Sequence, residues 1–103
     1  MLIYNVTVKV DEEIQSEWLK WMYEVHIPEV MATGKFLEYR VCRVLQDESE
    51  GVTFAVQYFS PDLATLVSYQ HADARRLQEA HAQRFSGRYV AFRTAMEVLT
   101  PPF

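Results

Sequence analysis

Residues 18–36, WLKWMYEVHIPEVMATGKF, constrain the fold of this chain more than any other stretch. Large side chains recur there at helical spacing up to Pro28. A proline removes a backbone donor and disfavours helical geometry in the residue before it, so we expect the first helix to break or kink there. We expect Gly34 to end the short turn that follows in a left-handed conformation, and the next strand to begin at Phe36.

The rest of the chain divides into strand-like and helix-like stretches. Apolar residues that alternate with polar ones are typical of a half-buried strand, and apolar residues three and four apart are typical of a helix. The predicted strands are residues 2–10, 36–45, 52–59 and 88–99, and the predicted helices are residues 12–27 and 60–85. The acidic loop QDESEG joins the second and third strands. The order βαββαβ predicts an α+β fold of the ferredoxin-like class, with a four-stranded antiparallel sheet and two helices on one face.

One side of each predicted helix should pack on the sheet. Asp11 is the expected N-cap of the first helix, Ser60 is the expected cap of the second, and Asp73 is a candidate cap after an interruption near residues 71–73. The expected inward residues are Ile14, Trp18, Trp21, Met22 and Val25 in the first helix, and Leu63, Val67, Gln70, Ala74, Leu77, His81 and Phe85 in the second. We expect Cys42 to be a buried small hydrophobe.

The even-numbered residues of the first, third and fourth strands are apolar enough to face the helices. The opposite face is then expected to carry Ile3, Asn5, Thr7, Lys9, Thr53, Ala55, Gln57, Phe59, Tyr89, Ala91, Arg93, Ala95 and Glu97. This mixture of small, polar and apolar side chains predicts a twofold homodimer through the helix-free sheet face. Arg40, Arg93, Glu38 and Glu97 lie on or beside this face and could form ion pairs across the interface, which we favour, or line an anion site between the subunits. A monomer with an ordinary mixed outer face is the alternative.

The composition narrows the class of protein. The chain has 103 residues, of which 50% are hydrophobic, so residues 1–103 are expected to form one domain with a proper core. A formal net charge of -4 argues against nucleic acid as a partner. The single cysteine favours a cytoplasmic location, and no signal peptide or run of ~18 apolar residues predicts contact with a membrane.

A histidine and several aromatic residues are expected at one end of the domain. The topology places His26 near Tyr4 and Tyr58, with Phe36 at the start of the neighbouring strand and Trp21 as a further wall. The start of the second helix, residues 60–63, should add unpaired N–H groups there. A histidine, two phenols and a helix N-terminus around an aromatic-walled gap predict a site for a small aromatic or anionic molecule.

Both inner histidines have two interpretations. His26 is either an acid, base or hydrogen-bond donor toward a ligand, or a structural group that satisfies carbonyls at the end of the first helix. His81 is expected in the core at the opposite end of the domain from His26, where the two cannot share a metal. No ligand-like spacing, Gly-rich phosphate loop or nucleophile motif is present, so the sequence predicts neither a metal nor a cofactor, and it assigns no catalytic residue.

The segments IYNVTVKVD, EWLKWMYEVHIPEVMATGKF, FAVQYF and GRYVAFRT together resemble the small bacterial proteins of the domain of unknown function 4286 family. The resemblance implies a dimeric α+β barrel within the ferredoxin-like class. That class contains cofactor-independent monooxygenases, isomerases, haem-degrading enzymes and non-catalytic members, so the resemblance transfers no activity. The expected function is a small-molecule-binding dimer, with a cofactor-independent oxygenase or isomerase as its catalytic form. A non-catalytic interaction or sensor module is the alternative.

Overall fold

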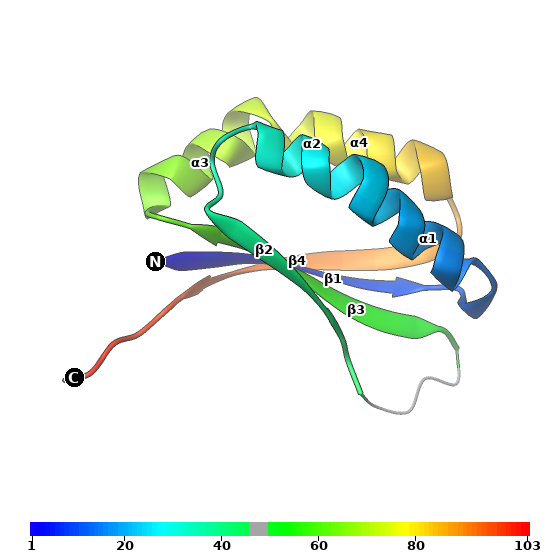
Figure 1. Ribbon diagram of the computed structural model, residues 1–103, viewed down its shortest axis with the longest axis horizontal. Coiled ribbons are helices and arrows are strands. Elements are labelled where there is room, and N and C mark those ends of the chain that lie inside the picture. The colour runs from blue at the N-terminus through cyan, green and yellow to red at the C-terminus, as the bar shows by residue number, and fades with distance from the viewer. Residues whose placement is uncertain (46–49) are drawn as a thin grey trace.

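Strand β1 (Leu2–Val10) lies at the centre of a sheet that organises the molecule (Figure 1). The computed structural model describes residues 1–45 and 50–103. The other strands are β2 (Glu38–Arg43), β3 (Val52–Ser60) and β4 (Tyr89–Glu97), and the sheet order is β2-β3-β1-β4 with every neighbouring pair antiparallel. Of the predicted loop QDESEG, residues 46–49 lie outside the described part of the chain.

All the helices cover one face of this sheet (Figure 1). They are a short 3-10 turn (Glu12–Ile14), α1 (Gln15–Trp21), a π-helical segment (Met22–His26), α2 (Ile27–Ala32), α3 (Leu63–Ala72) and α4 (Ala74–Phe85). The predicted ferredoxin-like α+β fold is therefore confirmed. Within the described residues no helix is both long enough and apolar enough to cross a membrane.

The inward faces of β1 and β3 follow the alternation in the sequence. Tyr4, Val8 and Val10 are buried on β1, and Val52, Phe54, Val56 and Tyr58 are buried on β3. In the antiparallel register Tyr4 lies opposite Tyr58, and Val8 lies opposite Phe54. Residues directly opposite each other point to the same side, so these pairs form the floor on which the helices pack.

The face predicted for β4 is wrong. The register pairs Val8 with Ala91 and Val6 with Arg93, so the odd-numbered residues of β4 share the inward side of β1. The apolar even-numbered residues Val90 and Phe92 are 67% and 63% exposed on the helix-free face. A strand whose two faces differ little in hydrophobicity does not fix its own register, because a shift by one residue exchanges the faces. Pairing with β1 sets the face of β4 instead.

Of the break or kink predicted for the first helix at Pro28, the break is wrong. The chain stays helical from α1 through the π-helical segment into α2, and the amide of Ile27 bonds to the carbonyl of Met22, five residues back. This wider turn places Pro28 in the first turn of α2, where a missing N–H is tolerated. The extra residue also shifts the inward stripe, so that Val25 is 37% exposed and Ile27 is buried. The helix ends as predicted at Gly34, with φ of +73°.

The second helix is interrupted at Asp73, as predicted, but its first half faces differently. Leu63 and Val67 are exposed, whereas Leu66 and Tyr69 are buried. The interruption changes the helical phase, so one stripe does not continue from α3 into α4. The stripe of α4 is as predicted, with Leu77 and Phe85 fully buried.

Three predicted caps use their side chains differently from the expectation. The helix start at α3 is capped by Asp62, whose carboxylate accepts from the amide of Thr65 at 2.8 Å, and Ser60 instead donates to the carbonyl of Asp62. Asp73 pairs with Lys35 at 2.6 Å, which joins the turn after α2 to the junction of α3 and α4. Asp11 pairs with Arg88 at 2.6 Å and bonds no helix amide with its side chain.

The helical phase of α3 can be tested with two leucines. Replacing Leu66, which is 1% exposed, by alanine should lower the free energy of unfolding by about 2–5 kcal/mol, because a buried leucine leaves a cavity. The matched change at Leu63, which is 64% exposed, should alter it by no more than about 0.5 kcal/mol. Urea unfolding of both variants measures the difference. Equal losses would contradict the observed phase.

Candidate functional site

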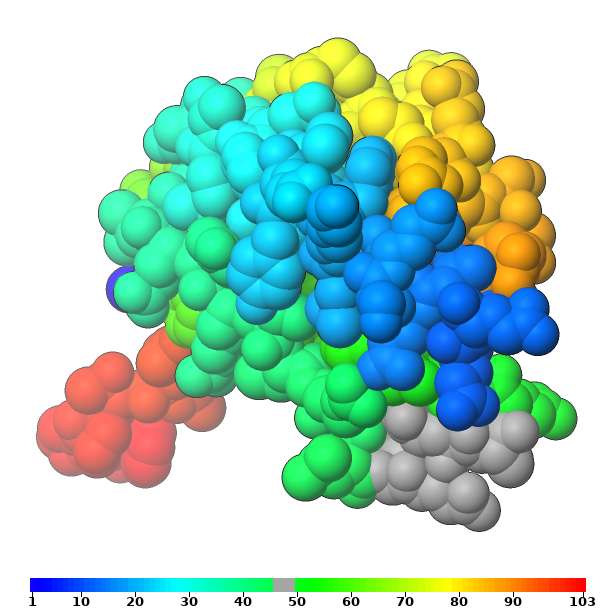
Figure 2. Space-filling model, turned by 45° about the vertical axis from the view of Figure 1, so that its right-hand side comes forward, coloured from blue at the N-terminus to red at the C-terminus, as the bar shows by residue number. Residues whose placement is uncertain are grey.

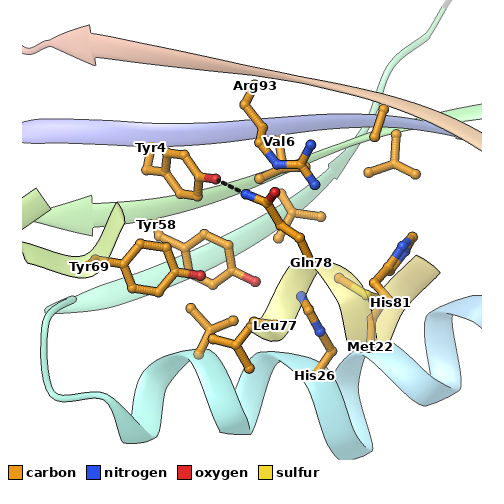
Figure 3. A pocket seen from close by; sticks show the side chains of 14 residues that line it. Tyr4, Val6, Met22, His26, Tyr58, Tyr69, Leu77, Gln78, His81 and Arg93 are labelled. Carbon is orange, nitrogen blue, oxygen red and sulfur yellow. Dashed lines mark hydrogen bonds between the residues drawn. The ribbon is translucent and has the colours of Figure 1, made fainter. Parts of the chain in front are cut away.

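A cavity lies between the sheet and the helices, roofed by the π-helical segment, α2 and α4 (Figure 3). The cavity volume is about 30 Å³, and all the space between its walls, open solvent included, is about 440 Å³. Side chains from every strand except β2, and from the π-helical segment, α2, α3 and α4, line it: Tyr4, Val6, Val8, Met22, His26, Val30, Val56, Tyr58, Tyr69, Leu77, Gln78, His81, Ala91 and Arg93. Figure 2 shows the first helix and α4 meeting in a continuous surface on the helical side of the molecule.

His26 reaches this cavity because of the π-helical segment that ends with it. In a regular helix, residues five apart differ by about 140° around the axis. The wider turn brings His26 back over Trp21, and the two rings stack with centroids 5.2 Å apart and an interplanar angle of 25°. The Nδ1 atom of His26 is buried and has no hydrogen-bond partner. His26 is therefore inside a helix rather than at its C-terminus, and the structural interpretation predicted for it is wrong.

His81 lies beside His26, with ring centroids 5.7 Å apart. The prediction that the two histidines sit at opposite ends of the domain is wrong, because the first helix continues past Pro28 and places His26 near its middle. His81 is in the core, as predicted, and its Nε2 accepts from the Nε1–H of Trp18 at 2.9 Å. A neutral imidazole that accepts at Nε2 carries its proton on Nδ1. This bond therefore fixes the tautomer of His81.

Burial keeps both histidines neutral. It lowers the pKa of His26 from 6.5 to about 4, with the positive charge of Arg93 as a smaller cause. It lowers the pKa of His81 to about 4 as well, with His26 and Arg93 as smaller causes. Charged imidazoles would be poorly solvated here. At neutral pH the cavity therefore presents two uncharged rings.

Aromatic rings form the wall at the other end of the cavity. Tyr4, Tyr58 and Tyr69 line it, and Phe36 packs behind them with its ring 5.2 Å from Tyr58 and 4.8 Å from Tyr69. The hydroxyl of Tyr58 is buried without a partner, and burial raises the pKa of this phenol well above its usual range. The hydroxyls of Tyr58 and Tyr69 point into the same space as His26 and Gln78 (Figure 3).

Two long polar side chains complete the lining, those of Gln78, which is half-buried, and Arg93, which is exposed. Arg93 extends from β4 toward Gln78 of α4 (Figure 3). The Nε2 of Gln78 donates to the hydroxyl of Tyr4 at 3.4 Å, which is a long bond. Within residues 1–45 and 50–103 no carboxylate pairs with Arg93.

Of the five predicted site residues, the structure brings His26, Tyr4 and Tyr58 to the cavity itself. Trp21 and Phe36 form its second layer, behind His26 and the tyrosines. The predicted contribution from the start of the second helix is absent, because none of residues 60–63 lines the cavity and Asp62 already caps that helix.

Sequence reasoning missed Arg93, Gln78, Tyr69 and His81 as cavity residues. Arg93 was assigned to the other sheet face by the wrong register of β4, and Tyr69 was hidden by the change of phase in α3. Cys42, predicted to be buried, is exposed on the helix-free side, because its partner on β3 is Ala55. No three metal-ligand side chains cluster in the described parts of the chain.

The neutral histidines make stability depend on pH. Because the pKa of each is lowered on folding, the unfolded chain binds protons more tightly between pH 6.5 and about 4. Stability is therefore full above pH 6.5 and falls as the pH drops through this window. His81→Gln keeps an acceptor for Trp18 but cannot titrate, so from pH 7 to pH 5 it should lose about 2 kcal/mol less than the unchanged chain.

Urea unfolding at pH 7, 6 and 5 measures these slopes. His71→Gln is the matched control, because His71 is exposed on α3 and lies away from the cavity. If His81→Gln and His71→Gln show the same pH slope, burial of a neutral His81 is contradicted.

Solved structures with the same fold belong to several differently described proteins. A dimeric ferredoxin-like protein from an uncultured marine organism matches with a TM-score of 0.72 and 8% identity, over 100% of this chain and 99% of that one. An ethyl tert-butyl ether d (EthD) family protein from Bacillus halodurans matches with a TM-score of 0.68 and 16% identity, over 96% of this chain and 100% of that one. A Streptomyces coelicolor monooxygenase in complex with the ligand nanaomycin D matches with a TM-score of 0.59 and 14% identity, over 99% and 92%.

Identities this low show the shared fold and leave the activity open. No curated protein matches the chain. At the level of sequence families, the model of a domain of unknown function matches residues 1–99, which is nearly the whole chain. The chain therefore belongs to the domain of unknown function 4286 family.

Proposed function

We propose that this chain binds a small aromatic or anionic molecule in the cavity between its sheet and its helices. The observation that carries the proposal is the pair of buried polar atoms without partners, Nδ1 of His26 and the hydroxyl of Tyr58, which line the same hollow. A buried polar group without a hydrogen bond is costly, and native proteins seldom keep one without a reason. Two such groups facing one cavity support a ligand that pairs with both.

The walls support an aromatic occupant. Tyr4 and Tyr58 are held by ring contacts with Phe36 and Tyr69, so the wall is rigid before any ligand arrives. The long side chains of Gln78 and Arg93, half-buried and exposed respectively, also line the cavity and are less tightly packed than the rings. A monooxygenase of the same fold has been solved with nanaomycin D bound, which supports a small-molecule role for the fold.

We limit the proposed function to binding, because the resting pKa of His26 is about 4. A general base works best when its pKa lies near the operating pH. An isomerase or a cofactor-independent oxygenase built on this site would need a bound anion to raise that pKa. The cavity groups therefore support catalysis less directly than they support binding.

We propose further that the chain is a homodimer through its helix-free sheet face. The corrected register makes that face more apolar than the sequence indicated, with Val90, Phe92 and Met96 exposed along β4. A contiguous exposed apolar surface is typical of an interface. Two solved structures of this fold are described as dimeric ferredoxin-like proteins, which supports the same assembly. This face also favours the second candidate function, an interaction module.

Filling the cavity should abolish binding. Ala91 lines the hollow from β4, so Ala91→Leu should weaken binding of aromatic compounds at least tenfold, at a stability cost of about 1–3 kcal/mol. Ala95→Leu is the matched control, since Ala95 shares the strand and the face but lies outside the lining. Ligand-observed NMR against a panel of aromatic acids and amides measures binding. Unchanged binding by Ala91→Leu would show that the cavity is not the site.

The dimer can be tested by placing one charge on the helix-free face. Phe92→Glu should give a monomer in light scattering, because a buried carboxylate without a partner is costly at an interface. Leu63→Glu is the control, because Leu63 is 64% exposed on α3 and Phe92 is 63% exposed on β4. A monomeric unchanged chain, or a dimer that survives Phe92→Glu, would contradict this interface.

A further inference from the structure

The cavity has an unbalanced charge. Arg93 brings a permanent positive charge to it, and none of the side chains that line it is an aspartate or a glutamate. The two histidines are neutral, and burial raises the pKa of the Tyr58 and Tyr69 phenols well above their usual range. The resting cavity therefore carries about one positive charge, and a bound monoanion would neutralise it.

The hydrogen-bonding groups of the cavity also favour an anion, because they can act as donors. Arg93 can only donate, and the hydroxyls of Tyr58 and Tyr4 each have a proton to donate, since Tyr4 already accepts from Gln78. The Nδ1 of His26 donates in one neutral tautomer. These groups come from β4, β3, β1 and the π-helical segment, and each of them has a proton that it can donate into the cavity.

The cavity is small, and it continues into open space. Its volume of about 30 Å³ leaves room for a polar head group, whereas the wider space between the same walls, open solvent included, is about 440 Å³. A ligand with a charged end and a ring would place the charged end among the buried polar groups and the ring toward solvent. Val6 and Ala91, which line the same space and are half-buried, would contact the ring.

We propose that the cavity is a carboxylate site, which selects an aromatic monoacid by its head group and uses Arg93 as the counter-ion. The proposal rests on the proposed small-molecule binding and names the class of ligand. A guanidinium pairs with a carboxylate through two parallel N–H bonds, which a lysine cannot reproduce. Tyr58 is 2% exposed, and its buried hydroxyl, which has no partner, supplies a second donor.

A comparison of benzoate with benzamide tests the effect of the ligand's charge apart from its shape, because the two molecules are nearly the same size. Calorimetry at pH 7 should show benzoate binding at least about tenfold tighter than benzamide, since hydrogen bonds to charged groups are the stronger ones. Arg93→Met should weaken benzoate binding about 10- to 100-fold and leave benzamide binding within about twofold. Tyr58→Phe should weaken benzoate binding by a smaller factor.

Arg75→Met is the matched control, because it removes the same charge from an exposed position on α4. Arg93→Lys keeps the charge without the planar guanidinium and should recover only part of the preference for benzoate. If benzamide binds as tightly as benzoate, the carboxylate site is wrong while small-molecule binding stands. If Arg75→Met weakens benzoate as much as Arg93→Met, the preference comes from overall charge and the site is again wrong. If neither compound binds and the wider aromatic panel also fails, both proposals are overturned.

Discussion

The arrangement of the helical layer depends on one buried hydrogen bond. The indole N–H of Trp18 donates to Nε2 of His81 at 2.9 Å, and this bond joins the first helix to α4 above the sheet. Trp18 is fully buried and its ring stacks on Phe54 of β3 at 5.0 Å, so the same side chain also fixes the helix to the sheet. Loss of the acceptor would leave a buried indole N–H unpaired, which costs free energy directly. The bond thus sets the distance between the helices and with it the space beneath them.

The same bond helps to explain why His81 is neutral and why the cavity carries the charge of Arg93 alone among its lining residues. With Nε2 of His81 engaged as an acceptor, protonating that ring would mean breaking the bond or repelling the donor. His26 next to it stays neutral because it is stacked on Trp21 and buried. A positive charge is therefore left only on Arg93, whose guanidinium is never deprotonated. The electrostatic character of the cavity follows from a contact between two core residues that are not part of any obvious motif.

The sequence predicted the fold well, because β1 and β3 each carry one clearly apolar face. It predicted β4 poorly, because Val90 and Phe92 are as apolar as a core face and yet lie outside. The prediction of a break at Pro28 failed for a different reason. A π-helical turn accommodates an extra residue before Pro28 and the missing N–H of the proline, and no local sequence pattern predicts such a turn. In the second helix the break was visible in the sequence but its effect on the phase of Leu66 and Tyr69 was not.

The site was predicted in part for the same reasons. Tyr4 and Tyr58 were found because they lie on the two strands whose faces were read correctly, and they are opposite each other in the register. His26 was placed near them by topology, although for a wrong reason, since it was expected at a helix end. Arg93 could not be found from the sequence, because its position depends on how β4 pairs with β1. Register between distant strands is a tertiary property, and only the assembled sheet decides it.

Strand β4 therefore connects the two proposed properties of the protein. Among the described residues it is an edge strand that pairs only with β1, and its alternate residues serve opposite faces, with Arg93 toward the cavity and Phe92 toward the helix-free side. Covering the outer face would hold β4 more firmly in its register, and that register is what puts Arg93 on the cavity side of the sheet. A partner on one face and a ligand on the other would thus stabilise the same backbone conformation. Two sites that favour one conformation are coupled, because each ligand shifts the population toward the state that the other one binds.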